Sequence, residues 1–129
     1  MNKSIMLSAL LLVSSAFAVD YVHTSSMENC VPDMDDAKCG KPIKMECVFK
    51  RVGKVITQHM PDNEKATFKI VGKRTTDDPD VRYYDVASPD GKAATIYIDP
   101  NAKRVYVQIA GENNFWVFVV EDSMFDYYK

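Results

Sequence analysis

The sequence lacks most of the short motifs by which enzymes are identified. It contains no G-x-S-x-G nucleophile elbow, no glycine-rich phosphate-binding loop and no H-E-x-x-H zinc motif. Only two histidines are present, His23 and His59, and neither lies near a cysteine at the regular spacing that a zinc site needs. We therefore expect a protein without enzyme activity, without a cofactor and without a bound metal ion.

Long apolar runs are missing after the first 18 residues. Those residues, MNKSIMLSALLLVSSAFA, carry one basic residue, then an apolar stretch, and end in Ala16-Phe17-Ala18. This is the three-part pattern of a secretory signal peptide. An uncleaved anchor is the alternative, but its apolar stretch of about 14 residues is shorter than the roughly 20 that a spanning helix needs. We therefore predict a signal peptide at 1–18, a secreted or periplasmic protein, and no membrane span after cleavage.

What the remaining residues do contain is a repeated alternation of apolar and polar side chains, typical of strands with one buried face. Turn sequences such as Ser88-Pro89-Asp90-Gly91 separate the runs, and links this short join antiparallel strands only. About seven such runs follow one another: IKMECVFKRV, KVITQHM, KATFKIVGKR, VRYYDVA, KAATIYI, RVYVQIA and FWVFVVE.

This pattern predicts a mostly β protein with a single domain. We expect an antiparallel meander of about seven strands over residues 43–129, closing into a small barrel or a compact sandwich, since closure removes exposed strand edges. Residues 19–42 show neither a helical stripe nor clear alternation, so we expect them to form an irregular N-terminal strap.

Cysteine is scarce, and all three residues lie between positions 30 and 47. The simplest pairing in an exported protein is Cys30 with Cys39, which would pin the strap on itself. The rival pairing, Cys30 with Cys47, would fasten the strap to the sheet, and a bridge from Cys39 to Cys47 or to another chain also remains open. Cys47 shares the apolar face of its strand with Phe49, so the first pairing would leave it buried and reduced.

Charge is unevenly distributed although the net charge is only −2. Ten bases and three acids lie between Lys38 and Arg74, whereas acids predominate on both sides of that segment. Folding could simply neutralise these segments; alternatively, strand parity could gather part of the basic set on one face that attracts an anionic partner. The candidates for such a face are Lys44, Lys50, Lys69, Lys73 and Arg74. Because the protein is expected to be exported, we favour a protein or a polysaccharide as its partner and exclude nucleic acid.

Aromatic residues suggest core packing, a ligand cavity or an exposed aromatic strip used for binding. Phe49, Phe68, Tyr83 and Tyr97 are the candidates for lining the interior of a barrel. Our leading hypothesis is a non-enzymatic binding or inhibitory module for an envelope or extracellular protein or polymer. The alternatives are a carrier of small ligands with a partly hollow barrel, and a structural or assembly subunit that makes contact through the apolar run FWVFVVE or the C-terminal aromatic residues.

Overall fold

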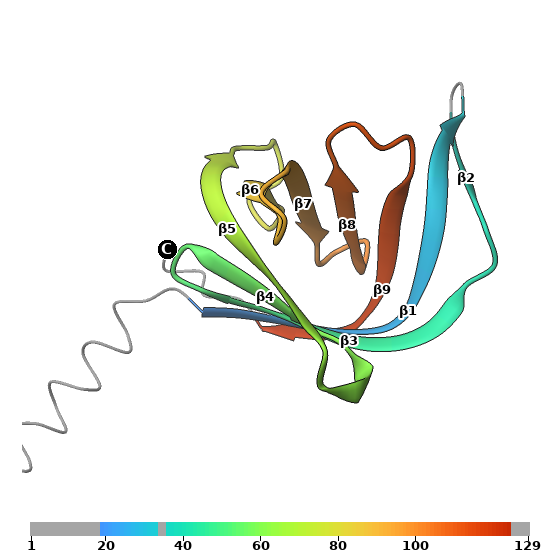
Figure 1. The fold of residues 1–129 in the computed structure, drawn as a ribbon, viewed down its shortest axis with the longest axis horizontal. Helices are drawn as coiled ribbons and strands as arrows, with labels where there is room; N and C mark the ends of the chain where they lie inside the picture. Colours follow the sequence, from blue (N-terminus) through green and yellow to red (C-terminus); the bar gives the residue numbers. More distant parts are fainter. Residues whose placement is uncertain (1–18, 34–35, 125–129) are drawn as a thin grey trace, which may run out of the picture.

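The computed structural model of the chain describes residues 19–33 and 36–124. Within these residues, nine antiparallel strands form one sheet, and a pairing between β1 and β9 closes eight of them into a barrel (Figure 1). The strands are β1 (Val19–Asp33), β2 (Asp36–Cys39), β3 (Ile43–Val52), β4 (Val55–His59), β5 (Lys65–Arg74), β6 (Arg82–Ala87), β7 (Ala93–Asp99), β8 (Arg104–Ile109) and β9 (Phe115–Met124), and the short 3-10 helix η1 (Pro61–Asn63) follows β4.

The predicted antiparallel β fold is confirmed, and the barrel is the form that it takes. The seven alternating runs of the sequence correspond to β3 through β9, and each pairs with the next along the chain. Gly91, in the turn between β6 and β7, has a φ of 85°. Residues other than glycine rarely adopt a positive φ, which explains why the turn requires glycine at that position.

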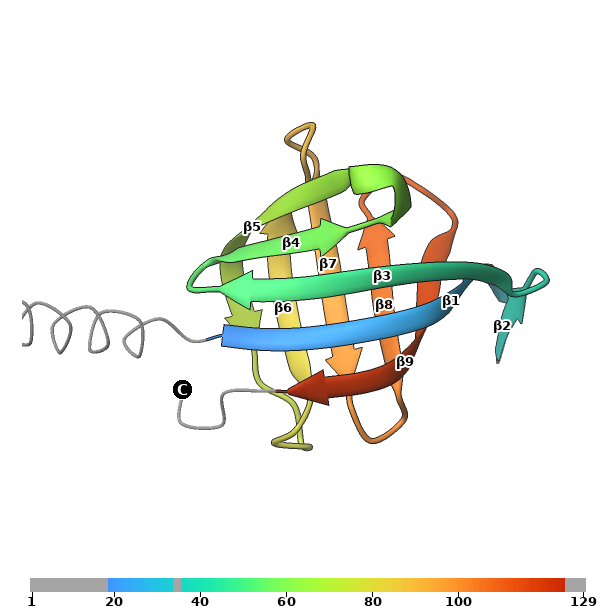
Figure 2. The same cartoon turned by 90° about the horizontal axis from the view of Figure 1, so that it is seen from below.

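The prediction of an irregular strap is wrong for residues 19–33. They form the long strand β1, which pairs with β3 on one edge and with β9 on the other and so closes the barrel (Figure 2). Two features hide this strand in the sequence. The inward positions Asp20 and Thr24 are polar, and a β-bulge between Thr24 and Ser26 shifts the register halfway along the strand.

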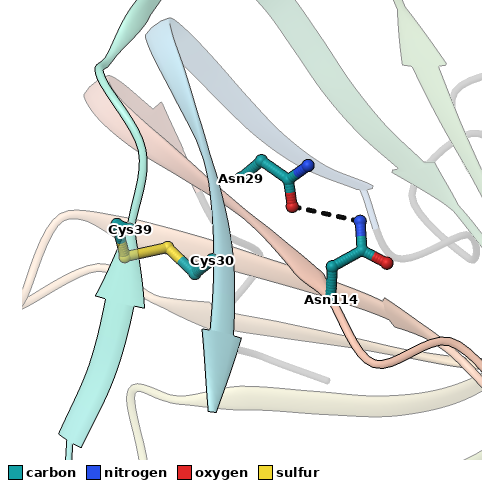
Figure 3. The surroundings of a disulfide bond; sticks show 4 residues. All are labelled: Asn29, Cys30, Cys39 and Asn114. Atoms are coloured by element: carbon teal, nitrogen blue, oxygen red, sulfur yellow. Dashed lines mark hydrogen bonds between the residues drawn. A yellow bond between two sulfur atoms is a disulfide. The ribbon is translucent and has the colours of Figure 1, made fainter. Parts of the chain in front are cut away.

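The short strand β2 lies outside the barrel and pairs only with the end of β1. Here the predicted disulfide between Cys30 and Cys39 is present (Figure 3). Closing a loop of about ten residues contributes on the order of 2–3 kcal/mol by constraining the unfolded chain. The amide of Asn114 donates a hydrogen bond to Oδ1 of Asn29 at 3.0 Å, which ties this end of β1 to the start of β9. A disulfide is consistent with an oxidising extracellular compartment; the predicted signal peptide lies outside the described residues.

The hydrophobic core lies inside the barrel. It is built from the inward-facing residues of every barrel strand, and branched aliphatic side chains predominate on β7 and β8. Two phenylalanines at its centre, Phe49 and Phe118, pack edge to face with ring centroids 5.0 Å apart. Because inward and outward residues alternate along each strand, this core also determines which side chains reach the outer face.

Candidate functional site

A row of four aromatic side chains crosses the outer face of the barrel from β6 to β9. It consists of Tyr83, Tyr97, Tyr106 and Phe115, one from each strand, and we call it the aromatic row. Successive ring centroids are 5.2, 5.7 and 6.4 Å apart, and the first two pairs are edge-to-face. Cross-strand aromatic pairs of this kind contribute about 0.5–1.5 kcal/mol each. The row therefore stabilises the sheet while keeping the rings in fixed positions.

Strand parity places these rings outside the core. Tyr84 of β6 and Ile96 of β7 are buried inside the barrel, so their neighbours Tyr83 and Tyr97 point to the opposite face. Tyr83 and Tyr97 lie opposite each other in the strand register, and both are half-buried. The outer face of this wall is thus more aromatic than a solvated sheet face usually is.

The aromatic row borders a shallow depression with a volume of about 480 Å³. Polar side chains complete its lining: Thr95 and Gln108, which lie opposite each other on β7 and β8, and Asp99 at the end of β7. Burial raises the pKa of Tyr97, and the charge of Asp99 raises it further. The phenol of Tyr97 is therefore neutral at physiological pH, and the depression offers aromatic surface together with donors and acceptors.

Arg74 of β5 lies at the Tyr83 end of the aromatic row. Its guanidinium carbon is 4.8 Å from the centroid of the Tyr83 ring, and Nη1 donates to the Tyr83 hydroxyl at 3.1 Å. Nε and Nη2 donate to the carboxylate of Asp85 at 3.0 and 2.8 Å. The hydrogen bonds to Asp85 and its charge raise the pKa of Arg74. The guanidinium thus stays charged and holds the first ring of the row in place.

The structure divides the aromatic residues that the sequence suggested for a cavity. Phe49 and Phe68 lie in the core, whereas Tyr83 and Tyr97 lie on the outer face, so the four do not line one cavity. The reason is parity, because Tyr83 shares the outer face of β6 with Asp85. Sequence analysis did not select Phe115 at all, because the run FWVFVVE is apolar at almost every position and conceals its parity.

The predicted basic face is also divided. Lys44, Lys50 and Lys69 have exposed side chains on β3 and β5. A β-bulge between Ile70 and Gly72 then reverses the parity of β5, so Lys73 lies opposite the buried Tyr84 and Arg74 lies opposite the outward Tyr83. Arg74 is paired with Asp85. The five residues therefore do not form one continuous face.

A buried ion pair that sequence analysis missed lies at the end of the barrel where β1 begins. Nε of Arg51 on β3 donates to Oδ2 of Asp20 on β1 at 2.7 Å, and Nη1 donates to the carbonyl of Gly53. The hydroxyl of Tyr84 is 3.5 Å from the same Asp20 oxygen, and burial raises the pKa of Tyr84. Asp20 and Arg51 are adjacent across β1 and β3, so this cluster joins the closing strand to the rest of the barrel.

Cys47 is buried in the core and is not part of the disulfide. Burial raises the pKa of its thiol, and hydrogen bonds from Gln58 and Thr24 oppose this only in part. A nucleophilic cysteine needs the opposite conditions, namely exposure and a lowered pKa. The geometry thus favours a packing role for Cys47.

We expect the Cys47 thiol to react with a maleimide reagent much more slowly in the native protein than in urea. The reason is that both access and thiolate formation require the barrel to open. The number of labels added is measured by mass spectrometry over time, with a small free thiol in the same tube as the reactivity control. Native labelling as fast as that control would contradict a buried thiol.

The described residues offer one tight group of potential metal ligands, Glu28, Cys30 and Cys39. The two sulfurs are joined in the disulfide and cannot act as thiolate ligands. In the loop before β6, Asp78 and Asp80 both accept hydrogen bonds from the amide of Asn101 at 3.2 Å. These acidic side chains are therefore engaged in joining two loops.

Comparison of the chain with protein-family models, with curated proteins and with solved structures finds no match. In the part of the chain that the structure describes, no helix has the length and the apolar character needed to cross a membrane. The aromatic row combines fixed rings with polar groups at one depression, and this geometry is the basis for a functional proposal.

Proposed function

We propose that this protein is an exported, non-enzymatic binding domain that holds an extracellular or envelope polysaccharide on the aromatic row. The observation that carries the proposal is a continuous row of four rings on an outer sheet face, next to a depression lined by Thr95, Asp99 and Gln108. Binding sites combine apolar and aromatic surface with a few placed polar groups. Aromatic rings can cover the apolar faces of sugar rings, while hydroxyl, amide and carboxylate groups bind sugar hydroxyls.

A protein partner is the second candidate for the same surface. Tyrosine, phenylalanine and arginine are enriched in protein interfaces, and the row contains three tyrosines and ends at Arg74. We favour a polysaccharide because the depression is shallow and lined by polar groups, whereas protein hot spots usually occupy well-packed pockets. The inhibitory role that the sequence suggested as an alternative would require a protein partner, since the inhibited molecule would itself be a protein.

A small-ligand carrier is less well supported. Such a carrier would bind its ligand inside the barrel, where Phe49, Phe68 and Ile96 are packed in the core cluster. The depression at the aromatic row lies outside this core. Export itself is proposed on the predicted signal peptide, with the disulfide as supporting evidence.

Replacing Tyr97 by alanine is expected to weaken polysaccharide binding about tenfold or more, the loss typical of a residue at the centre of a binding surface. Tyr97→Phe keeps the ring and should bind within about threefold of the unmodified protein if ring contact dominates. Binding is measured by depletion from solution over insoluble peptidoglycan, chitin and cellulose. Each variant is first shown by thermal unfolding to be folded at the assay temperature.

Tyr21→Ala is the matched control. Tyr21 is an exposed tyrosine of β1 that does not belong to the aromatic row, so its removal should leave polysaccharide binding unchanged. Failure of the unmodified protein to bind any polysaccharide, or equal binding by Tyr97→Ala, would contradict the proposal. If a purified extracellular protein were bound in a Tyr97-dependent way and no polysaccharide were, the row would belong to the second candidate.

A further inference from the structure

A surface of valines and lysines lies at the end of the barrel where β1 begins. Val52 lies opposite Val55 across the β3–β4 hairpin, and Val55 lies opposite Lys69 on β5. The carbonyl of Lys54, in the hairpin turn, accepts a hydrogen bond from the backbone of Ile70 at 2.8 Å, which brings the turn next to Val71. We call this surface the valine–lysine face, and its members are Lys50, Val52, Lys54, Val55, Lys69 and Val71.

The three valines of this face are exposed to solvent. Val52, Val55 and Val71 have exposed fractions of 41, 37 and 71%. Val71 is the extra residue of the β-bulge on β5, which explains why its side chain turns away from the core. A single exposed valine needs no explanation, but three on one surface indicate a site that something apolar covers.

The lysines make this apolar surface positive. Lys50, Lys54 and Lys69 are exposed, and no ion pair joins any of them to an acidic side chain within the described residues. The acids of β3 to β5 and of the connections between these strands are Glu46, near the other end of β3, and Asp62 and Glu64, which follow the far end of β4. The valine–lysine face thus carries uncompensated positive charge, and its complement is an anionic surface.

We propose that the valine–lysine face docks the protein onto an anionic lipid surface. Lysine stems lie along apolar surface while their ammonium groups reach the headgroups, and the valines between them enter the interface. A protein partner fits less well, since lysine is depleted from protein interfaces and valine is uncommon among hot spots. A soluble polyanion would attract the lysines but would gain nothing from the exposed valines.

Most of the valine–lysine face lies on a different wall of the barrel from the aromatic row. In the closed sheet, β3 and β4 lie across the barrel from β7 and β8, and Figures 1 and 2 show these pairs of strands on opposite walls. Val71 on β5 is the exception, because it lines a depression together with Thr95 and Gln108, which also border the aromatic row. Docking through β3 and β4 would leave β7 and β8 on the wall that faces away from the membrane. This inference does not depend on what the aromatic row binds.

Co-sedimentation with vesicles tests the proposal. Vesicles of phosphatidylcholine and phosphatidylglycerol in equal amounts should bind the protein, and vesicles of phosphatidylcholine alone should bind it weakly. Neutralising all three lysines (Lys50→Gln, Lys54→Gln and Lys69→Gln) should lower the partition coefficient roughly a hundredfold, at about fivefold for each charge. Replacing all three valines (Val52→Ser, Val55→Ser and Val71→Ser) should lower it at least about tenfold with the charge unchanged.

The opposite end of β3 supplies a matched control. Lys41→Gln, Ile43→Ser and Lys44→Gln together remove two exposed lysines and one exposed apolar side chain outside the valine–lysine face, so vesicle binding should change less than about threefold. The mass of each purified protein is measured to verify that the unmodified protein and all variants carry the same N-terminus. Equal binding by every variant, or no binding by the unmodified protein, would overturn the proposal. A third outcome would also overturn it. If the triple serine variant bound vesicles normally, and the triple glutamine variant bound neither vesicles nor dextran sulfate, the face would recognise polyanions in general.

Discussion

Replacing Arg51 by alanine is expected to lower the free energy of unfolding by about 3–5 kcal/mol. The side chains of Arg51 and Asp20 are only 11% and 2% exposed, and their ion pair is 2.7 Å long. Removing the guanidinium takes away the charged hydrogen bond that Arg51 makes to the buried Asp20 carboxylate, and it removes the cation that lies 5.8 Å from the centroid of the Tyr84 ring. Since Asp20 belongs to the strand that closes the barrel, the loss should also loosen the pairing of β1 with β3.

Arg74→Ala provides the control for this prediction. Arg74 also pairs with an aspartate, through two hydrogen bonds to Asp85, but the two side chains are 52% and 34% exposed. Water solvates the remaining carboxylate after the loss of such an exposed pair, so we expect a much smaller loss of stability than for Arg51→Ala. Urea denaturation followed by tryptophan fluorescence gives both values. Similar losses from the two variants would show that the Arg51 pair is solvated and would contradict its structural role.

Periodicity predicted the part of the fold in which apolar and polar residues alternate without interruption. The runs that became β6, β7 and β8 have buried residues at every second position, and their short turns permit only antiparallel neighbours. The periodicity did not predict β1, because its inward positions include Asp20 and Thr24, whose burial depends on partners from other strands. Asp20 pairs with Arg51, and Thr24 donates a hydrogen bond to the carbonyl of Cys47. Tertiary contacts of this kind leave no periodic signal.

The candidate sites were predictable only where parity was unbroken. The polar neighbours Asp85 and Thr95 identify the outer faces of β6 and β7, and the same parity would have placed Tyr83 and Tyr97 outside. The bulge at Val71 carries no comparable signal, yet it separates Lys73 from Lys69 and exposes a valine. The outward positions of Tyr83 and Tyr97 could thus be found from the sequence, whereas that of Phe115 could not, and the valine–lysine face depends on a local register shift that only the structure shows.

Whether the barrel is solid or hollow has a direct consequence for the core, and Phe49 is the residue that tests it. Phe49 is 1% exposed and packs against Phe118 at the centre of the barrel. In a filled core, Phe49→Ala loses the transfer free energy of the ring and also leaves a cavity that its neighbours cannot close. We therefore expect the free energy of unfolding, measured in urea, to fall by about 3–5 kcal/mol.

Phe115→Ala is the comparison for this substitution, because it removes the same side chain from the outer face. Phe115 is half-buried and contacts Tyr106 with the ring centroids 6.4 Å apart, so its removal should cost about 1 kcal/mol. If the barrel were partly hollow, Phe49→Ala would only enlarge an existing cavity, and its cost would approach the roughly 1.5–3 kcal/mol of transfer alone. A loss that small, together with a ligand seen by native mass spectrometry, would favour the carrier over the binding domain, because ligand and core cannot occupy the same interior.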